Sequence, residues 1–190
     1  NASAGPTWDF LGFVDDGDPD LTLLARRGDT LLGTSDVLEV HRAAAFVVGV
    51  GDPRTRRLLD ARAREAGLRP ATLVHPAATL GRDVVIGEGS VVCSHVSLTT
   101  HIVLGRHVHL NLNCTVGHDV VVGDFSTVNP GATISGNVTL HDDVTVGTNA
   151  AVIQGISLGA GSTVGAGAAV VRDVEPGVTV VGVPARPLTR

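Results

Sequence analysis

Residues 110–128 read LNLNCTVGHDVVVGDFSTV, and a branched aliphatic residue stands at every sixth position of this stretch. The same period runs without a slip from Val74 to Val170, where every sixth residue is Val, Leu or Ile. Four places after each of these residues the side chain is nearly always small or β-branched. A fixed short period is the signature of a solenoid, in which equivalent residues of successive coils stack above one another.

The repeat predicts strands of two or three residues joined by tight corners, where Gly, Asn and Asp tolerate positive φ. We expect the aliphatic side chains to point inward and form a column, each contributing about 1.5–3 kcal/mol on burial. No insertion interrupts the period, so no long loop folds over the solenoid. A functional site is therefore expected on a flat face or between copies of the chain.

Residues 1–73 do not follow the six-residue rule. Three apolar runs predict short strands at residues 10–14, 43–50 and 71–74. Asp52 as N-cap and Pro53 at the first helical position predict a helix that runs to about Ala66 and stops at Gly67. Strand, helix and strand in this order indicate a small α/β unit with a parallel sheet.

The turn before the helix has two interpretations, and the helix itself carries a cluster of arginines. The turn Gly49-Val50-Gly51-Asp52 can present backbone N–H groups to a phosphate, or it can be an ordinary strand-to-helix turn. The arginines of the helix are expected to form a solvated face: Arg54, Arg56, Arg57, Arg62 and Arg64.

The composition narrows the class of protein. The chain has 190 residues with 43% hydrophobic and 3% aromatic content, which suits one or two domains built from flat, stacked β layers. The formal net charge is -5, so the chain lacks the excess of basic residues that is typical of nucleic-acid-binding proteins. No apolar run is long enough to insert in a membrane, and no signal-peptide pattern is present. Cys93 and Cys114 form no CxxC pair, and we expect buried or half-buried free thiols in a cytoplasmic protein.

From about Leu73 to Pro187 the pattern resembles the hexapeptide-repeat acyltransferases, whose left-handed parallel β-helix has three six-residue sides per coil. The ending Gly182-Val183-Pro184-Ala185-Arg186 is similar to the C-terminal Gly-x-Pro-Ala-Lys/Arg of that family. The resemblance implies a mainly β chain, with a left-handed parallel β-helix at residues 74–190. A small, truncated Rossmann-like α/β domain is expected at residues 1–73.

The leading segment is similar to the domain that binds the sugar nucleotide in bacterial sugar-nucleotide N-acetyltransferases and sialic-acid O-acetyltransferase-like enzymes. The segment 12–16 stands at the second-strand acidic pair of that family, and 48–51 stands at its next glycine turn. The resemblance therefore implies substrate contacts at Asp15, Asp16 and Gly51. The opening strand and glycine-rich turn of the family have no counterpart here, and the chain contains no Met, so we expect an N-terminal truncation.

Acetyl transfer from a thioester needs a base for the nucleophile and a donor for the developing oxyanion. His is the natural base near neutral pH. His118 lies at a corner, where Asp119 can orient its ring; the base of the family is the His of a His-Glu or His-Asp pair at this place. Coils of eighteen residues put Gly136 one coil after His118, where we expect room for the thioester and an exposed N–H. The alternative is that His118 is a surface corner residue.

The other histidines occupy mixed corner and side positions or lie outside the repeat, and none is predicted to be catalytic: His41, His75, His95, His101, His107, His109 and His141. For acetyl-CoA as cosubstrate, the resemblance implies contacts at four positions of the repeat: Thr127, Gly136, Thr148 and Ala166. Thr127 stands where some members carry a second histidine.

The sequence therefore predicts an acetyl-CoA-dependent acetyltransferase acting on the amino group of a nucleotide-linked amino sugar. By resemblance it is a cytoplasmic homotrimer with acetyl-CoA between neighbouring β-helices, and no metal is expected. Two alternatives are a sugar O-acetyltransferase and a non-catalytic scaffold. A third, the zinc site of a γ-class carbonic anhydrase, needs histidines matched on stacked coils, and no two histidines of the repeat are one or two full coils apart. Nothing in the sequence identifies the sugar, the nucleotide or the pathway.

Overall fold

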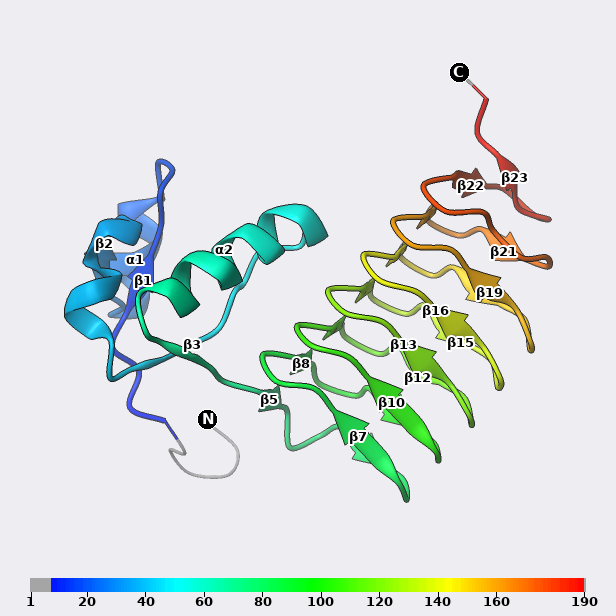
Figure 1. The fold of residues 1–190 in the computed structure, drawn as a ribbon, viewed down its shortest axis with the longest axis horizontal. Coiled ribbons are helices and arrows are strands. Elements are labelled where there is room, and N and C mark those ends of the chain that lie inside the picture. Colours follow the sequence, from blue (N-terminus) through cyan, green and yellow to red (C-terminus); the bar gives the residue numbers. More distant parts are fainter. Residues whose placement is uncertain (1–7, 190) are drawn as a thin grey trace.

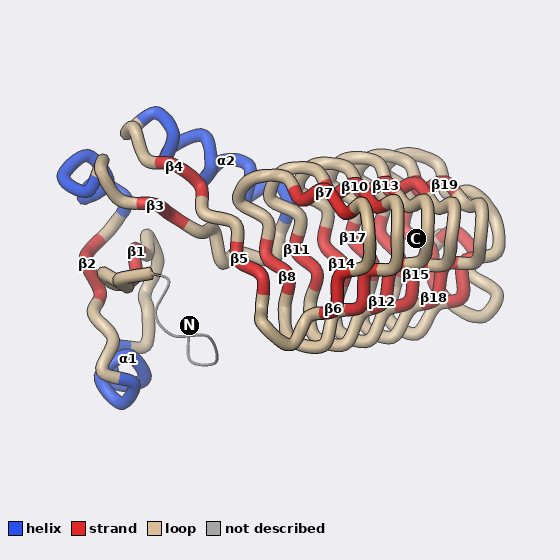
Figure 2. Tube along the Cα trace, turned by 90° about the horizontal axis from the view of Figure 1, so that it is seen from below, coloured by secondary structure: helices blue, strands red, loops and turns tan. Residues whose placement is uncertain are grey.

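A long stack of β coils and a smaller α/β unit make up the molecule (Figure 1). The structure is a computed structural model that describes residues 8–189. The α/β unit lies beside the N-terminal coils, and α2 (Pro53–Glu65) is the part of it that approaches the stack (Figures 1 and 2). None of the helices within residues 8–189 has the length and apolar character needed to span a membrane.

The α/β unit contains two separate pairs of parallel strands, β1 with β2 and β3 with β4. In chain order its elements are β1 (Phe13–Val14), α1 (Leu21–Arg27), β2 (Leu31–Gly33), the 3-10 helix η1 (Ser35–His41), β3 (Ala45–Phe46), α2 and β4 (Arg69–Pro70). The predicted order of strand, helix and parallel strand is confirmed for β3, α2 and β4. Whether the unit is Rossmann-like stays a prediction.

Local capping explains where α2 begins and ends. The Asp52 side chain accepts a hydrogen bond from the backbone N–H of Thr55, and Pro53 opens the helix, as predicted. Gly67 follows the helix with a φ of +89°, a conformation that glycine adopts without strain.

The predicted strands of residues 1–73 were less accurate. The strand at residues 10–14 is reduced to β1, and the run at 43–50 to β3. The run at 71–74 contributes only β5 (Leu73–Val74), which pairs with the solenoid, because the partner of β3 is β4. The elements α1, β2 and η1 were missed, although Asp20 and Gly28 cap α1 as a helix signal would require.

Three parallel sheets form the sides of the β-helix, as the family resemblance implied. One contains β5, β8 (Val91–Val92), β11 (His109–Leu110), β14 (Thr127–Val128), β17 (Thr145–Val146), β20 (Thr163–Val164), β22 (Thr179–Val181) and the antiparallel β23 (Arg186–Pro187). The second contains β6 (Thr79–Leu80), β9 (Ser97–Leu98), β12 (Thr115–Val116), β15 (Thr133–Ile134), β18 (Ala151–Val152) and β21 (Ala169–Val170). The third contains β7 (Val84–Ile86), β10 (Ile102–Leu104), β13 (Val121–Val122), β16 (Thr139–Leu140) and β19 (Ser157–Leu158).

Strand pairing confirms the eighteen-residue coil, since Leu110 pairs with Val128 and Val116 with Ile134. The aliphatic column is buried from Val92 to Val170. Val74 and Leu80 are 41% and 39% exposed, because no coil covers the first turn of the stack. Cys93 and Cys114 are free thiols, as expected: Cys93 is half-buried and Cys114 is buried.

The corners obey the same period as the core. From Asp83 to Gly167 every sixth residue has a positive φ. Most of these residues are Gly, Asn or Asp. Gly has no side chain, and Asn and Asp have short ones, so all three adopt this conformation more easily than other residues. The same conformation is adopted by three histidines and one phenylalanine: His95, His101, His107 and Phe125. The period therefore places residues eighteen apart at the same corner of neighbouring coils.

Candidate functional site

His118 and Asp119 form a pair at the corner between β12 and β13. Nδ1 of His118 lies 2.7 Å from Oδ2 of Asp119, and both side chains are about half exposed. This contact leaves Nε2 of His118 without a hydrogen-bond partner among residues 8–189. The hydrogen bond from His118 lowers the pKa of Asp119, so the carboxyl remains ionised near neutral pH. A carboxylate that accepts from Nδ1–H leaves Nε2 as the basic nitrogen of a neutral imidazole.

Gly136 lies one coil after His118, as the period predicted. A β-carbon at Gly136 would be 2.5 Å from Nε2 of His118 and 2.6 Å from Cε1, so the imidazole packs directly on the glycine backbone. The imidazole itself occupies the room that we expected for a thioester. The N–H of Gly136 has no acceptor within the described part of the chain. Gly136 is buried beneath the His118 imidazole, so this N–H is not exposed as we expected.

His101 also contacts this pair, which the sequence did not lead us to expect. Its Nδ1 lies 3.3 Å from Oδ1 of Asp119, the carboxylate oxygen that His118 leaves free. His101 and Asp119 are eighteen residues apart, so the spacing of the repeat could have identified this neighbour.

Thr127 lies on another side of the β-helix, and it is buried. Its hydroxyl accepts a hydrogen bond of 2.9 Å from Nη2 of Arg56 and lies 3.3 Å from the carbonyl oxygen of Gly51. Thr148 and Ala166 are exposed residues one coil apart at a third corner, after β17 and β20. Within one copy of the chain, the structure does not bring these three residues together with His118 and Gly136.

The predicted substrate residues of the α/β unit have structural partners. Asp16 accepts hydrogen bonds from the backbone N–H and the hydroxyl of Ser35, at 2.6 and 2.7 Å, and Arg62 lies 3.2 Å away. The backbone hydrogen bond from Ser35 is the largest cause of the lowered pKa of Asp16. Asp15 accepts from the N–H of Gly17 within its own turn. These contacts show how the acidic pair supports the local fold.

Arg56 corrects the predicted solvated face of α2, because its side chain is fully buried. Its guanidinium donates to carbonyl oxygens of the solenoid and of the turn before α2: His107, Phe125, Ser126, Val50 and Gly51. Burial lowers the pKa of Arg56 to about 10, which still leaves it charged at neutral pH. The arginine therefore fastens the Gly51 turn to the coil that carries Thr127.

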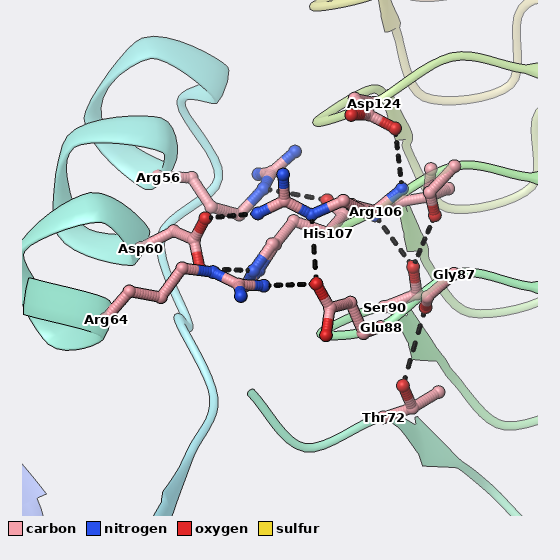
Figure 3. Close-up of polar contacts among 12 residues, drawn as sticks. Arg56, Asp60, Arg64, Thr72, Gly87, Glu88, Ser90, Arg106, His107 and Asp124 are labelled. Atoms are coloured by element: carbon pink, nitrogen blue, oxygen red, sulfur yellow. Dashed lines mark hydrogen bonds and ion pairs between the residues drawn. The ribbon is translucent and has the colours of Figure 1, made fainter. Parts of the chain in front are cut away.

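A second polar cluster joins α2 to the β-helix (Figure 3). Asp60 is buried and accepts hydrogen bonds from Arg64 at 2.8 Å and from Arg106 at 2.7 Å. Its carboxylate also lies 2.8 Å from Nε2 of His107. Glu88 pairs with both of these arginines. Burial lowers the pKa of His107, which favours its neutral form. The cluster is an interface between the two parts of the chain.

Residues 8–189 contain no group of three or more His, Cys, Asp and Glu side chains arranged to hold a metal ion. The zinc alternative therefore gains no support from the geometry of the described residues. At the corner that holds His118, Nε2 of the imidazole and the N–H of Gly136 have no hydrogen-bond partner among residues 8–189.

Comparisons with known proteins identify one curated relative and several solved structures that resemble this chain. No family model matches the chain. The chain is 33% identical over 112 residues to the GDP-perosamine N-acetyltransferase of Escherichia coli O157:H7, a match that covers 57% of this chain and 48% of that protein. The chain thus spans about half the length of this curated relative.

Two solved structures match over most of their length. The acetyltransferase domain of PglB from Neisseria gonorrhoeae FA1090 has a TM-score of 0.86 at 35% identity, covering 93% of this chain and 86% of that chain. It has also been solved with acetyl coenzyme A. A histidine-to-asparagine variant of perosamine N-acetyltransferase from Caulobacter crescentus, in complex with CoA and GDP-perosamine, has a TM-score of 0.84 at 30% identity. That match covers 86% of this chain and 80% of that chain.

Proposed function

Because the chain belongs to the sugar-nucleotide N-acetyltransferases of the hexapeptide-repeat family, we propose that it transfers an acetyl group from acetyl-CoA to the amino group of a nucleotide-linked amino sugar. The observation that carries this proposal is the His118–Asp119 pair, with Nε2 of His118 free above Gly136. The relatives solved with CoA, acetyl coenzyme A or GDP-perosamine support the choice of donor and acceptor classes.

Bound acetyl-CoA is the acyl donor. The residues at the His118 corner transfer the proton and stabilise the charge that develops during the reaction. Asp119 accepts Nδ1–H of His118 and thereby leaves a lone pair on Nε2. Nε2 then takes a proton from the sugar amine as its nitrogen bonds to the acetyl carbon. The N–H of Gly136 is the candidate donor for the negative charge that develops on the acetyl oxygen. The proton held by Nε2 can pass to the departing thiolate of CoA.

The remaining contacts belong to the proposal. We assign backbone contacts with acetyl-CoA to Gly136, Thr148 and Ala166, and keep Thr127 as a fourth candidate although its hydroxyl already pairs with Arg56. Asp15, Asp16 and Gly51 are the candidate sugar-nucleotide contacts. We place the reaction in the cytoplasm, which suits the free thiols of Cys93 and Cys114.

The proposal is tested by incubating the protein with acetyl-CoA and a panel of GDP-, UDP-, dTDP- and CMP-linked amino sugars. Release of free CoA thiol and a mass increase of one acetyl group on a single sugar nucleotide are expected. Mapping the acetyl group by NMR separates attack by nitrogen from attack by oxygen. A protein that binds neither acetyl-CoA nor any sugar nucleotide would be a scaffold, and the proposal would be wrong.

Replacing Gly136 with alanine is expected to lower kcat by about 10-fold or more, because the new β-carbon displaces the His118 imidazole. The ring is half exposed and can swing outward, so we expect little change in the melting temperature. Gly177→Ala is the control for activity, since a β-carbon there meets no atom within 4 Å and Gly177 lies outside the residues proposed to bind either substrate. Steady-state kinetics and thermal denaturation of both variants check the prediction, and equal activity of the two would contradict it.

The active assembly is proposed to be a homotrimer with acetyl-CoA bound between neighbouring β-helices. An exposed apolar column supports association: Val85, Val103 and Val121 pair across β7, β10 and β13 and are 54%, 46% and 45% exposed. Light scattering is expected to give three times the mass of one chain. Val103→Arg should dissociate the assembly, whereas Val40→Arg, at a site 82% exposed, should not. A monomeric wild-type protein would exclude a site shared between copies.

A further inference from the structure

We propose that His101 is a positioning residue that holds the Asp119 carboxylate in the orientation required by His118. The proposal rests on the function proposed above, because it concerns the same base. The observation behind it is the contact of His101 with Asp119, which lies one coil after it.

The fold brings these side chains together at one corner. Asp83, His101 and Asp119 stand eighteen residues apart, and all three have φ values between +53° and +57°. The N–H of Asp119 donates to the carbonyl oxygen of Thr100, which fixes the backbone of one coil on that of the coil before it. The three side chains therefore leave the stack at equivalent points, one above another.

Each oxygen of Asp119 faces a different imidazole. Oδ2 lies 2.7 Å from Nδ1 of His118, and Oδ1 lies 3.3 Å from Nδ1 of His101. The opposite nitrogen of His101, Nε2, lies 4.0 Å from Oδ2 of Asp83. The charged and titratable groups that face His101 are thus Asp83 and Asp119, with His118 beyond Asp119.

This arrangement has a consequence for the base. An exposed aspartate with one partner can rotate about its side-chain bonds and lose the contact with His118. A protonated Nδ1 of His101, which lies 3.3 Å from Oδ1, attracts this oxygen and favours the rotamer in which Oδ2 faces Nδ1 of His118. His118 then keeps its proton on Nδ1 and its lone pair on Nε2. His101 acts through Asp119 and needs no contact with either substrate.

The test compares His101→Ala, His101→Asn and the control His95→Ala. His95 has the same kind of positive-φ position, with a φ of +59°, but lies at a different corner of the β-helix from Asp119, so it controls for backbone strain. Asn is the conservative variant because its Nδ2 branches from Cγ as Nδ1 of His does, and Asn tolerates positive φ. All three proteins are examined as the full chain.

The first readout is the tautomer of His118, measured by long-range proton–nitrogen NMR without substrates. We expect mainly the Nδ1–H form in the wild type, His101→Asn and His95→Ala, and a shift toward the Nε2–H form in His101→Ala. The second readout is turnover, where His101→Ala should lower kcat by about 3- to 10-fold with little change in KM. His101→Asn should recover most of this loss.

The two readouts distinguish the positioning role of His101 from the proposed acetyltransferase function. If the wild type transfers no acetyl group but the tautomer of His118 still depends on residue 101, the proposed function is wrong and the positioning role stands. If His101→Ala keeps both the wild-type tautomer and the wild-type kcat, the positioning role is overturned and the function is untouched. Equal losses in His101→Ala and His95→Ala would assign the effect to corner strain and would also overturn it.

Discussion

We expect His118→Ala to lower kcat for acetyl transfer by about 100-fold or more, because removing a general base typically costs a factor of about 10² to 10⁴. The KM values for acetyl-CoA and the sugar nucleotide should change little, since Nε2 handles a proton during reaction. The melting temperature should also stay close to that of the wild type. The imidazole is 50% exposed and makes its one side-chain hydrogen bond to Asp119.

Asp119→Asn provides the second half of this prediction. An amide at residue 119 can donate to Nδ1 of His118, which moves the ring proton to Nε2 and blocks the base. We expect a loss of kcat of about 10-fold or more, in steady-state assays of thiol release. His75→Ala is a suitable control because His75 lies outside this corner and its Nδ1 accepts from the backbone N–H of Ala77. Full activity of His118→Ala would mean that His118 is only a surface corner residue.

The repeat made most of the fold predictable. The six-residue period predicted both the inward column and the corners. The family resemblance added three-sided coils of eighteen residues, and with them the register of His118 with Gly136. The first coil departs from it, since Val74 and Leu80 have no coil beneath them. Burial depends on neighbours in space, and the period cannot say where the stack ends.

The α/β unit was harder to predict because its strands have two or three residues and carry little periodic signal. Arg56 shows why the contacts between the α/β unit and the β-helix were also missed. Arg54 and Arg56 both lie in the first turn of α2, yet Arg56 is fully buried and Arg54 is exposed. The difference arises from the face of α2 that meets the β-helix, which local sequence does not specify. His101 was missed for another reason: its contact is with Asp119, one coil away, and the eighteen-residue spacing predicted the neighbour of His118 but was not extended to Asp119.

Arg56→Met is expected to destabilise the protein by about 3–5 kcal/mol, the range seen when one partner of a buried charged group is removed. Methionine retains the apolar stem of the side chain but leaves the carbonyl oxygens of His107 and Phe125 buried without a donor. Arg56→Lys should lose less, because an ammonium group reaches some of these oxygens but lacks the fork geometry of the guanidinium. Urea denaturation measures the loss.

The exposed Arg54, on the same helix, supplies the control Arg54→Met, for which we expect a change within about 0.5 kcal/mol. The loss at Arg56 should also have a functional signature. Its guanidinium holds the carbonyl oxygens of Val50 and Gly51, so the turn proposed to contact the sugar nucleotide should loosen. In Arg56→Lys, KM for the sugar nucleotide should rise while the His118 tautomer stays that of the wild type, since the His118 corner lies on another side of the β-helix. A variant as stable as Arg54→Met, with unchanged KM, would show that Arg56 is not needed to hold the α/β unit, and that the Asp60 cluster and the Arg57–Asp143 ion pair suffice.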